Sequence, residues 1–230
     1  MMLAARGVFL AARRNRKPTA KSYVQDGLIA MWDGIENAGW GTHDANATTW
    51  KDLSGNGYDL TPHGNVSWQS NSARFDGASY FRRAAISGVA VAECVFARRV
   101  PTGFFVVFQN NFSCLIGLNN NFICLAPTNG SNMTYYRNTY QPILDTMTHQ
   151  LSCNYLSWTM SKDGVEQTPV GTNANGAVGN YLQLGARVFN NAVGGYFDGD
   201  LYTVRLYSRA PTAAEIAANY AVDKARFNLP

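Results

Sequence analysis

The sequence is poor in the residue types on which catalytic and metal sites are built. Its 230 residues include only three histidines, four cysteines and four glutamates. His43, His63 and His149 are scattered without the spacing of metal ligands, and there is neither a GxSxG motif nor a glycine loop suited to phosphate. The composition thus gives no positive sign of zinc, nucleotide or serine-nucleophile chemistry.

Long hydrophobic runs are also missing. No uninterrupted apolar stretch approaches the roughly 18 residues that a membrane span requires. The N-terminal segment resembles an export signal only superficially, because its apolar run from Val8 to Ala12 is short and its basic residues follow that run. We therefore expect no membrane span and no signal peptide, and a chain that folds in the cytoplasm.

Charged residues make up only 15% of the chain, and much of the positive charge lies at the N-terminus. The formal net charge is +4, and the first 21 residues contain six basic ones, namely Arg6, Arg13, Arg14, Arg16, Lys17 and Lys21. Because the remainder is nearly neutral, we expect no nucleic-acid partner for the body of the protein. We expect residues 1–21 to form a basic arm that attaches to other subunits of an assembly, and residues 22–230 to form one domain.

The cysteines indicate a reducing environment. Cys94, Cys114, Cys124 and Cys153 all lie within apolar stretches and lack the close paired spacing of zinc or redox motifs. We therefore expect buried free thiols.

What the chain has in abundance favours β-structure. It contains 21 glycines, 12 tyrosines and 12 phenylalanines, and eleven short runs with strand character recur between turn signals. The pair Asp163-Gly164 predicts a tight hairpin. This pattern predicts an all-β domain with two packed sheets.

One helix is expected near the C-terminus. Thr212 and Glu215 have the spacing of a capping box, and Ile216, Tyr220 and Phe227 give an apolar stripe that can pack on a sheet. We expect a short packing helix.

Several segments, taken in order, resemble a known family. These are GLIAMWD, WKDLSGNGYDLTPHG, ARFDGASYF, LSWTMSKDGVEQ and YFDGDLYTVRLYSRAPTAAEIAANY, which together extend from about residue 26 to residue 227. They resemble the laminin-G-like, concanavalin A-like domains of bacteria and phages. The resemblance implies a two-sheet antiparallel jelly-roll sandwich.

The resemblance also bears on cofactors. Domains of this family often hold a structural calcium ion with carboxylate and carbonyl oxygens, for which Asp52 and Asp198 are the candidate ligands here. However, Tyr202 stands where many relatives have an acidic residue, which weakens the case for the ion. No other cofactor is expected.

Fold does not determine function, so the site must be argued from side chains. Sugar binding needs an aromatic face beside polar groups that reach hydroxyls. The segment 129–140 offers such a set, and Trp40 lies in an earlier loop; the predicted ligand-binding residues are Asn132, Tyr135, Tyr136, Arg137, Tyr140 and Trp40. The alternative is that these aromatics are ordinary strand and edge residues.

A carboxylate pair for hydrolysis is hard to find. The ExDxE signature of laminarinase-like hydrolases is absent, and only Asp198 and Asp200 lie on alternate residues of one predicted strand. Their FDGD setting indicates a turn, where Gly199 would have a positive φ and the carboxylates a packing or metal role.

These observations predict a non-enzymatic recognition module that binds glycans. Its expected location is a phage particle, as a fibre or decoration protein, or a bacterial cell surface, and homo-oligomers would be compatible with either. Two alternatives remain open: a purely structural protein of a virion or other assembly, and a glycoside hydrolase that uses Asp198 and Asp200.

Overall fold

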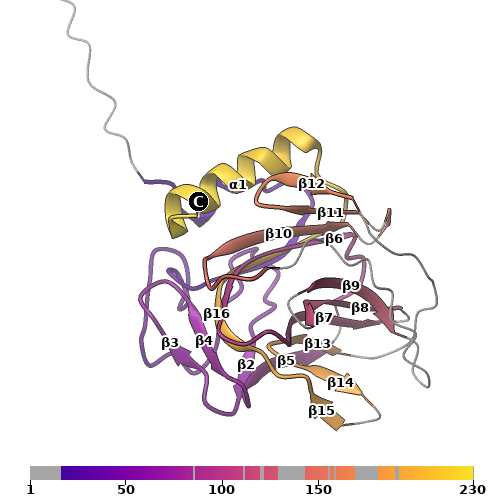
Figure 1. Cartoon of the computed structure of the whole chain (residues 1–230). Helices are drawn as coiled ribbons and strands as arrows, with labels where there is room; N and C mark the ends of the chain where they lie inside the picture. The colour runs from indigo at the N-terminus through magenta and orange to yellow at the C-terminus, as the bar shows by residue number, and fades with distance from the viewer. Residues whose placement is uncertain are drawn as a thin grey trace, which may run out of the picture.

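The computed structural model describes residues 17–84, 86–110, 112–119, 122–128, 143–154, 156–157, 159–168, 181–189 and 192–229. Two antiparallel sheets pack against each other, which confirms the predicted two-sheet β-sandwich with a C-terminal helix (Figure 1). Because the strands are short and alternate apolar with polar residues, each sheet can bury one face against the other.

The larger sheet has eight strands in the order β12-β11-β10-β6-β16-β4-β3, with β1 also paired to β16. Its strands are β1 (Leu28–Asp33), β3 (Ser67–Trp68), β4 (Ala73–Asp76), β6 (Val91–Arg98), β10 (His149–Asn154), β11 (Thr159–Lys162), β12 (Val165–Gln167) and β16 (Asp198–Tyr207). The long central strands β6 and β16 pair along most of their length and anchor the sheet.

The smaller sheet has six strands in the order β2-β5-β13-β7-β8-β9. They are β2 (Thr61–His63), β5 (Tyr80–Ala84), β7 (Gly103–Asn110), β8 (Phe112–Asn119), β9 (Phe122–Thr128) and β13 (Tyr181–Leu184). A separate hairpin is formed by β14 (Arg187–Phe189) and β15 (Ala192–Gly194).

The core lies between the sheets. In β6, Ala92, Cys94 and Phe96 belong to the main cluster of buried apolar side chains, whereas Val95 packs with Phe227 on the opposite face. Cys94 and Cys153 are buried and form no disulfide, as predicted, and the side chains of Cys114 and Cys124 lie outside those that the structure describes.

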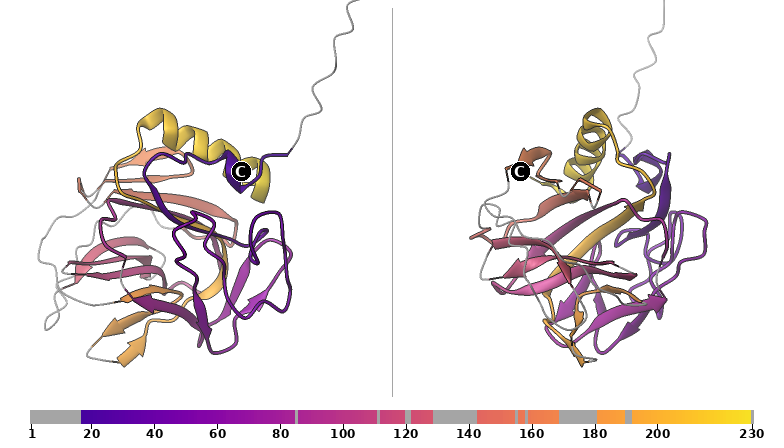
Figure 2. Two further views of the ribbon diagram at one scale, coloured as in Figure 1. Left: turned by 180° about the vertical axis from the view of Figure 1, so that it is seen from behind. Right: turned by 90° about the vertical axis from the view of Figure 1, so that its right-hand side faces the viewer.

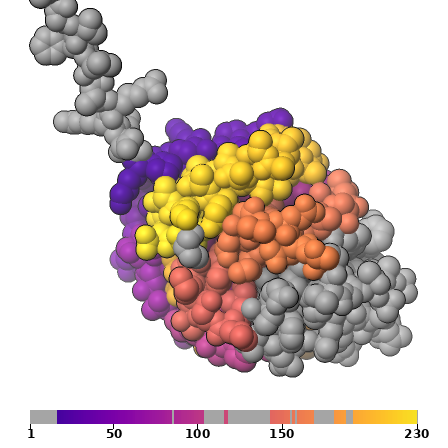
Figure 3. All heavy atoms as spheres, turned by 45° about the horizontal axis from the view of Figure 1, so that its top comes forward, coloured from indigo at the N-terminus to yellow at the C-terminus, as the bar shows by residue number. Residues whose placement is uncertain are grey.

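Helix α1 (Ala213–Phe227) lies on the outer face of the larger sheet, away from the smaller one (Figure 2). It begins with the predicted capping box, in which the amide of Glu215 donates to Thr212 Oγ1 at 3.3 Å and the amide of Thr212 donates to Glu215 Oε2 at 2.8 Å. The helix lies between the N-terminal segment and the β11–β12 hairpin (Figure 3). That hairpin turns at Asp163 and Gly164, whose φ values of 51° and 75° match the predicted tight turn. No helix among the described residues is long and apolar enough to span a membrane.

The N-terminal segment packs against the domain from Ala20 onwards. A short 3₁₀ helix, η1 (Ala20–Ser22), places Ala20 and Tyr23 in a buried cluster with Met31, and the Ala20 amide donates to Glu36 Oε1 at 3.0 Å. The boundary expected after residue 21 therefore falls inside a packed segment. Residues 1–16 of the arm lie outside the described residues.

The FDGD segment is a strand and not a turn. Gly199 pairs with Phe75 of β4 and Arg98 of β6, and the predicted positive φ is wrong. A Cβ at this position would meet the Ala97 carbonyl oxygen and the ring of Phe197. Glycine is required here because the neighbouring backbone approaches closely.

Candidate functional site

The aromatic platform predicted from sequence cannot be placed. Asn132, Tyr135, Tyr136, Arg137 and Tyr140 all lie outside the described residues. Their role in ligand binding stays a prediction.

Trp40, the remaining predicted ligand-binding residue, lies in the loop that follows β1. Its side chain is 39% exposed, and Lys21 Nζ lies 5.0 Å from the ring centroid. The indole is therefore at the surface but already contacts a cation, an arrangement that ties the end of the arm to this loop.

The two predicted calcium ligands have protein partners. Asp52 accepts hydrogen bonds from the amides of Met31 at 3.0 Å, Ser54 at 2.9 Å and Tyr58 at 2.9 Å, and so holds the SGNG turn against β1. Asp198 accepts from Arg99 Nε at 2.6 Å. Within the described part of the chain, no three acidic, histidine or cysteine side chains group as metal ligands would. These contacts give both carboxylates a structural role without an ion.

Asp200, the second member of the carboxylate pair considered for hydrolysis, is likewise ion-paired. Arg74 donates to its two oxygens at 3.0 and 3.1 Å, and Ser72 Oγ donates at 3.2 Å. Asp198 and Asp200 are therefore each held by an arginine, which favours the packing role over an acid and nucleophile pair.

A different group of side chains gathers on the smaller sheet, on the face that points away from the core. We name it the Arg82 cluster, and it consists of His63, Tyr80, Arg82, Tyr181, Gln183 and Tyr196. The sequence reading did not single out these residues for ligand binding.

Strand alternation places the centre of this cluster. In β5, Phe81 is fully buried in the core, so its neighbours Tyr80 and Arg82 project from the opposite face. In β13, Gln183 is the register partner of Arg82, and Tyr181 pairs with Ala84, two residues further along β5 and on the same face. The run SYFRRA alternates an apolar residue with polar and aromatic ones, which indicates a strand with one outward polar face. It does not indicate that this strand pairs with β13.

The guanidinium of Arg82 is held by three neighbours. Its central carbon lies 5.2 Å from the ring centroid of Tyr80 and 4.9 Å from that of Tyr181, and its Nε donates to Gln183 Oε1 at 2.8 Å. Its two terminal nitrogens make no hydrogen bond to the described residues. Arg82 therefore presents two donor groups from a fixed orientation.

Aromatic rings extend the cluster to either side. His63 stacks on Tyr80 with centroids 4.7 Å apart and planes 7° from parallel, and Tyr196 lies 6.3 Å from Tyr80. Tyr181 is 43% exposed. The result is a surface of aromatic faces around one cation, beside Gln183, whose buried Nε2 has no hydrogen-bond partner.

Neither the protein-family models nor the curated proteins compared with this sequence give a match. Solved structures do match. A mutant of Trypanosoma rangeli sialidase displaying trans-sialidase activity is 12% identical with a TM-score of 0.60, over 86% of this chain and 33% of that one. Domain 4 of AbnA, a GH43 extracellular arabinanase from Geobacillus stearothermophilus solved in complex with arabinotriose, is 16% identical with a TM-score of 0.59, over 84% of this chain and 98% of that one.

These comparisons establish the fold at the level of a β-sandwich of the jelly-roll type. The chain spans only about a third of the sialidase but nearly all of the arabinanase domain. The prediction of a non-enzymatic protein is contradicted, because structures similar to this chain include a sialidase and part of an arabinanase. At such low identity the likeness carries no catalytic residue over to this chain.

Proposed function

We propose that this domain binds glycans through the Arg82 cluster, and that it prefers glycans that carry a carboxylate. The observation that supports this most directly is the Arg82 guanidinium, which lies over two tyrosine rings while its terminal nitrogens have no partner among the described residues.

The chemistry of the cluster suits a sugar. The apolar face of a pyranose can stack on an exposed ring such as Tyr181, and hydroxyl groups can pair with the terminal nitrogens of Arg82. The terminal nitrogens of a guanidinium match the two oxygens of a carboxylate, and such charge-assisted pairs are stronger than neutral hydrogen bonds. Because Arg82 is already oriented by its neighbours, binding would lose little of its side-chain entropy.

The comparisons support a glycan ligand by analogy. The AbnA domain, which this chain matches over almost its whole length, was solved with arabinotriose. Other matched structures are of a sialidase, one of them in complex with sialic acid, a sugar that carries a carboxylate. That the domain is displayed on a phage particle or a bacterial surface is a separate proposal.

A glycan array that includes sialylated and uronic-acid glycans, followed by calorimetry on the best ligand, tests the proposal. Replacing Arg82 with glutamine or Tyr181 with alanine should weaken binding at least roughly tenfold, since each removes one strong contact. Arg83→Gln is the matched control, because it makes the same charge change one residue along the strand, where the guanidinium lies over Tyr58 instead.

Two results would count against the proposal. Either no glycan binds a protein whose thermal melt shows it to be folded, or binding survives both changes in the Arg82 cluster. Equal loss in the Arg83 control would mean that net charge, and not the cluster, attracts the ligand.

A further inference from the structure

A row of polar residues crosses the outer face of the larger sheet. The pairing register places Glu166 opposite Ser161, Ser161 opposite Ser152, Ser152 opposite Glu93, and Glu93 opposite Arg205. Directly opposed residues in a sheet share a face, so all five side chains lie on the side that α1 occupies.

Helix α1 covers one half of this row completely. Arg205 and Glu93 are both fully buried, and α1 contributes Asp223 to the arginine and Asn219 to the glutamate. Tyr23 from the N-terminal segment adds its ring over the guanidinium at 4.0 Å. This half of the row is therefore filled by protein groups.

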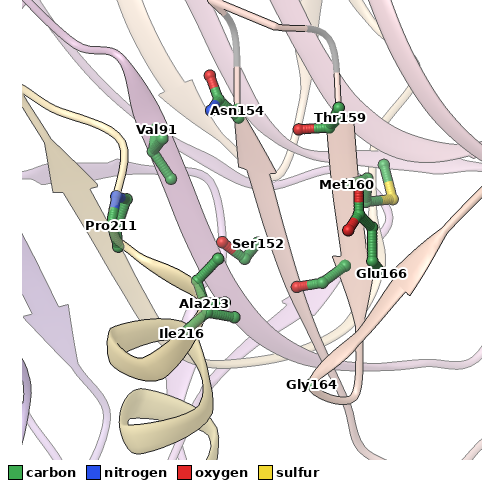
Figure 4. Close-up of a pocket in the computed structure, with 11 residues that line it drawn as sticks. Val91, Ser152, Asn154, Thr159, Met160, Gly164, Glu166, Pro211, Ala213 and Ile216 are labelled. Carbon is green, nitrogen blue, oxygen red and sulfur yellow. The ribbon is translucent and has the colours of Figure 1, made fainter.

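The other half of the row borders a cavity of about 260 Å³ between the first turn of α1 and strands β10, β11 and β12. Figure 4 shows Ser152 facing Ala213 and Ile216 of the helix, with Thr159 and Glu166 on the opposite side of the cavity. The side chains of Ser152, Ser161 and Glu166, which the helix does not cover completely, thus line this cavity.

One group in this cavity lacks a hydrogen bond that its burial demands. Ser161 is only 7% exposed, and its Oγ has no hydrogen-bond partner among the residues that the structure describes. Buried hydroxyls in native proteins are nearly always paired with protein or ordered water, so this one has the capacity to bond a water or a ligand hydroxyl in the cavity.

The walls of the cavity define the chemistry of that partner. One wall supplies the hydroxyls of Ser152, Thr159 and Ser161 and the carboxylate of Glu166, while the other is apolar through Ala213 and Ile216. No basic side chain is among the described residues that line it, so an anion would meet only repulsion from Glu166. The volume lies below the range of about 300–1,000 Å³ typical of sites for drug-sized molecules.

We propose that this cavity is a second ligand site, distinct from the Arg82 cluster, which binds one uncharged sugar ring or a similar small polyol. Its hydroxyl groups would pair with Ser161 and Glu166, and its apolar face would lie on the first turn of α1. The site lies on the other sheet from the Arg82 cluster, so it does not depend on the function proposed there.

The test is titration of the whole protein with a panel of neutral methyl glycosides, followed by calorimetry and by amide NMR shifts. Ser161→Ala should weaken binding about tenfold, by removing a hydrogen bond in a desolvated position. The same change should leave the thermal midpoint unchanged or raise it, because it removes an unsatisfied buried hydroxyl. A purely structural serine would show the opposite, a lower midpoint.

A blocking variant keeps the test independent of that hydroxyl. Ala213→Phe should fill the cavity and abolish binding, whereas Ala214→Phe, at the next position of the same helical turn and outside the lining, should not. Arg82→Gln should leave this binding intact, which separates the two sites.

The proposal is overturned if no neutral glycoside shows saturable binding, or if binding persists in both Ser161→Ala and Ala213→Phe. It is also overturned if the shifted amides lie around Arg82 and disappear with Arg82→Gln, because one site would then explain all binding.

Discussion

Replacing Arg205 with methionine should destabilise the domain by about 3–5 kcal/mol at neutral pH, the usual cost of breaking a buried ion pair from one side. Arg205 is fully buried and donates to Glu93 Oε2 at 3.0 Å and to the two oxygens of Asp223 at 2.8 and 2.7 Å. Methionine replaces the aliphatic part of the arginine side chain, while two buried carboxylates lose their cation.

The effect can be measured by urea denaturation. Trp32 and Trp50 are fully buried and should report unfolding through their fluorescence. In a domain of this size each kcal/mol shifts the melting temperature by about 2–4 °C, so the variant should melt about 6–20 °C lower. Lys51→Met is the control, since its ion pair with Asp59 is exposed and should contribute less than about 1 kcal/mol.

The loss should also depend on pH. Burial raises the pKa of Glu93 even though Arg205 opposes this, and without the arginine the pKa should rise further. A carboxyl whose pKa is raised on folding favours the folded state at low pH, and this contribution is lost as the pH rises through the raised pKa. The loss in free energy of unfolding of Arg205→Met relative to wild type should therefore become smaller as the pH falls towards 4. A deficit below about 1 kcal/mol, or one that does not vary with pH, would refute the reasoning.

Three further outcomes are expected. Gly199→Val should lower the thermal midpoint strongly, because its side chain would meet the Ala97 carbonyl oxygen, and an unchanged midpoint would contradict that packing. Burial alone would lower the pKa of His149. The hydrogen bonds to the carboxylates of Asp163 and Asp145 outweigh this effect, so the pKa of His149 is raised. The stability that His149→Gln loses relative to wild type should thus be greatest below pH 6.5 and decline at higher pH, as chemical denaturation at several pH values would show. Deleting residues 1–16 should leave the melt unchanged while weakening any salt-sensitive association, which sedimentation at two ionic strengths would detect.

Features that depend on a few neighbouring residues could be predicted from the sequence. The hairpin at Asp163 and Gly164 needs two residues that tolerate a positive φ, and the sequence shows them side by side. The same holds for the capping box of Thr212 and Glu215, which are three residues apart. Local turn and cap chemistry is thus enough to mark element boundaries.

Features that depend on register between distant strands could not be predicted. Arg82 meets Gln183 only because β5 pairs with β13, and these two residues are 101 positions apart. The local composition of FDGD predicts a turn, yet pairing with β4 and β6 makes this segment a strand. Tertiary pairing here overrides local propensity.

Two arginines on outward faces of the sandwich, Arg205 and Arg82, differ in how their charge is neutralised. Arg205 is neutralised by Glu93 and Asp223 and sealed beneath α1, so its charge is fully satisfied within the protein. The described residues give the Arg82 guanidinium two aromatic rings and an amide but no carboxylate. Since two carboxylates surround Arg205 and no described carboxylate pairs with Arg82, we propose that an anion from outside the chain pairs with Arg82. This difference between two similar side chains is the physical reason to search for an acidic glycan on the smaller sheet.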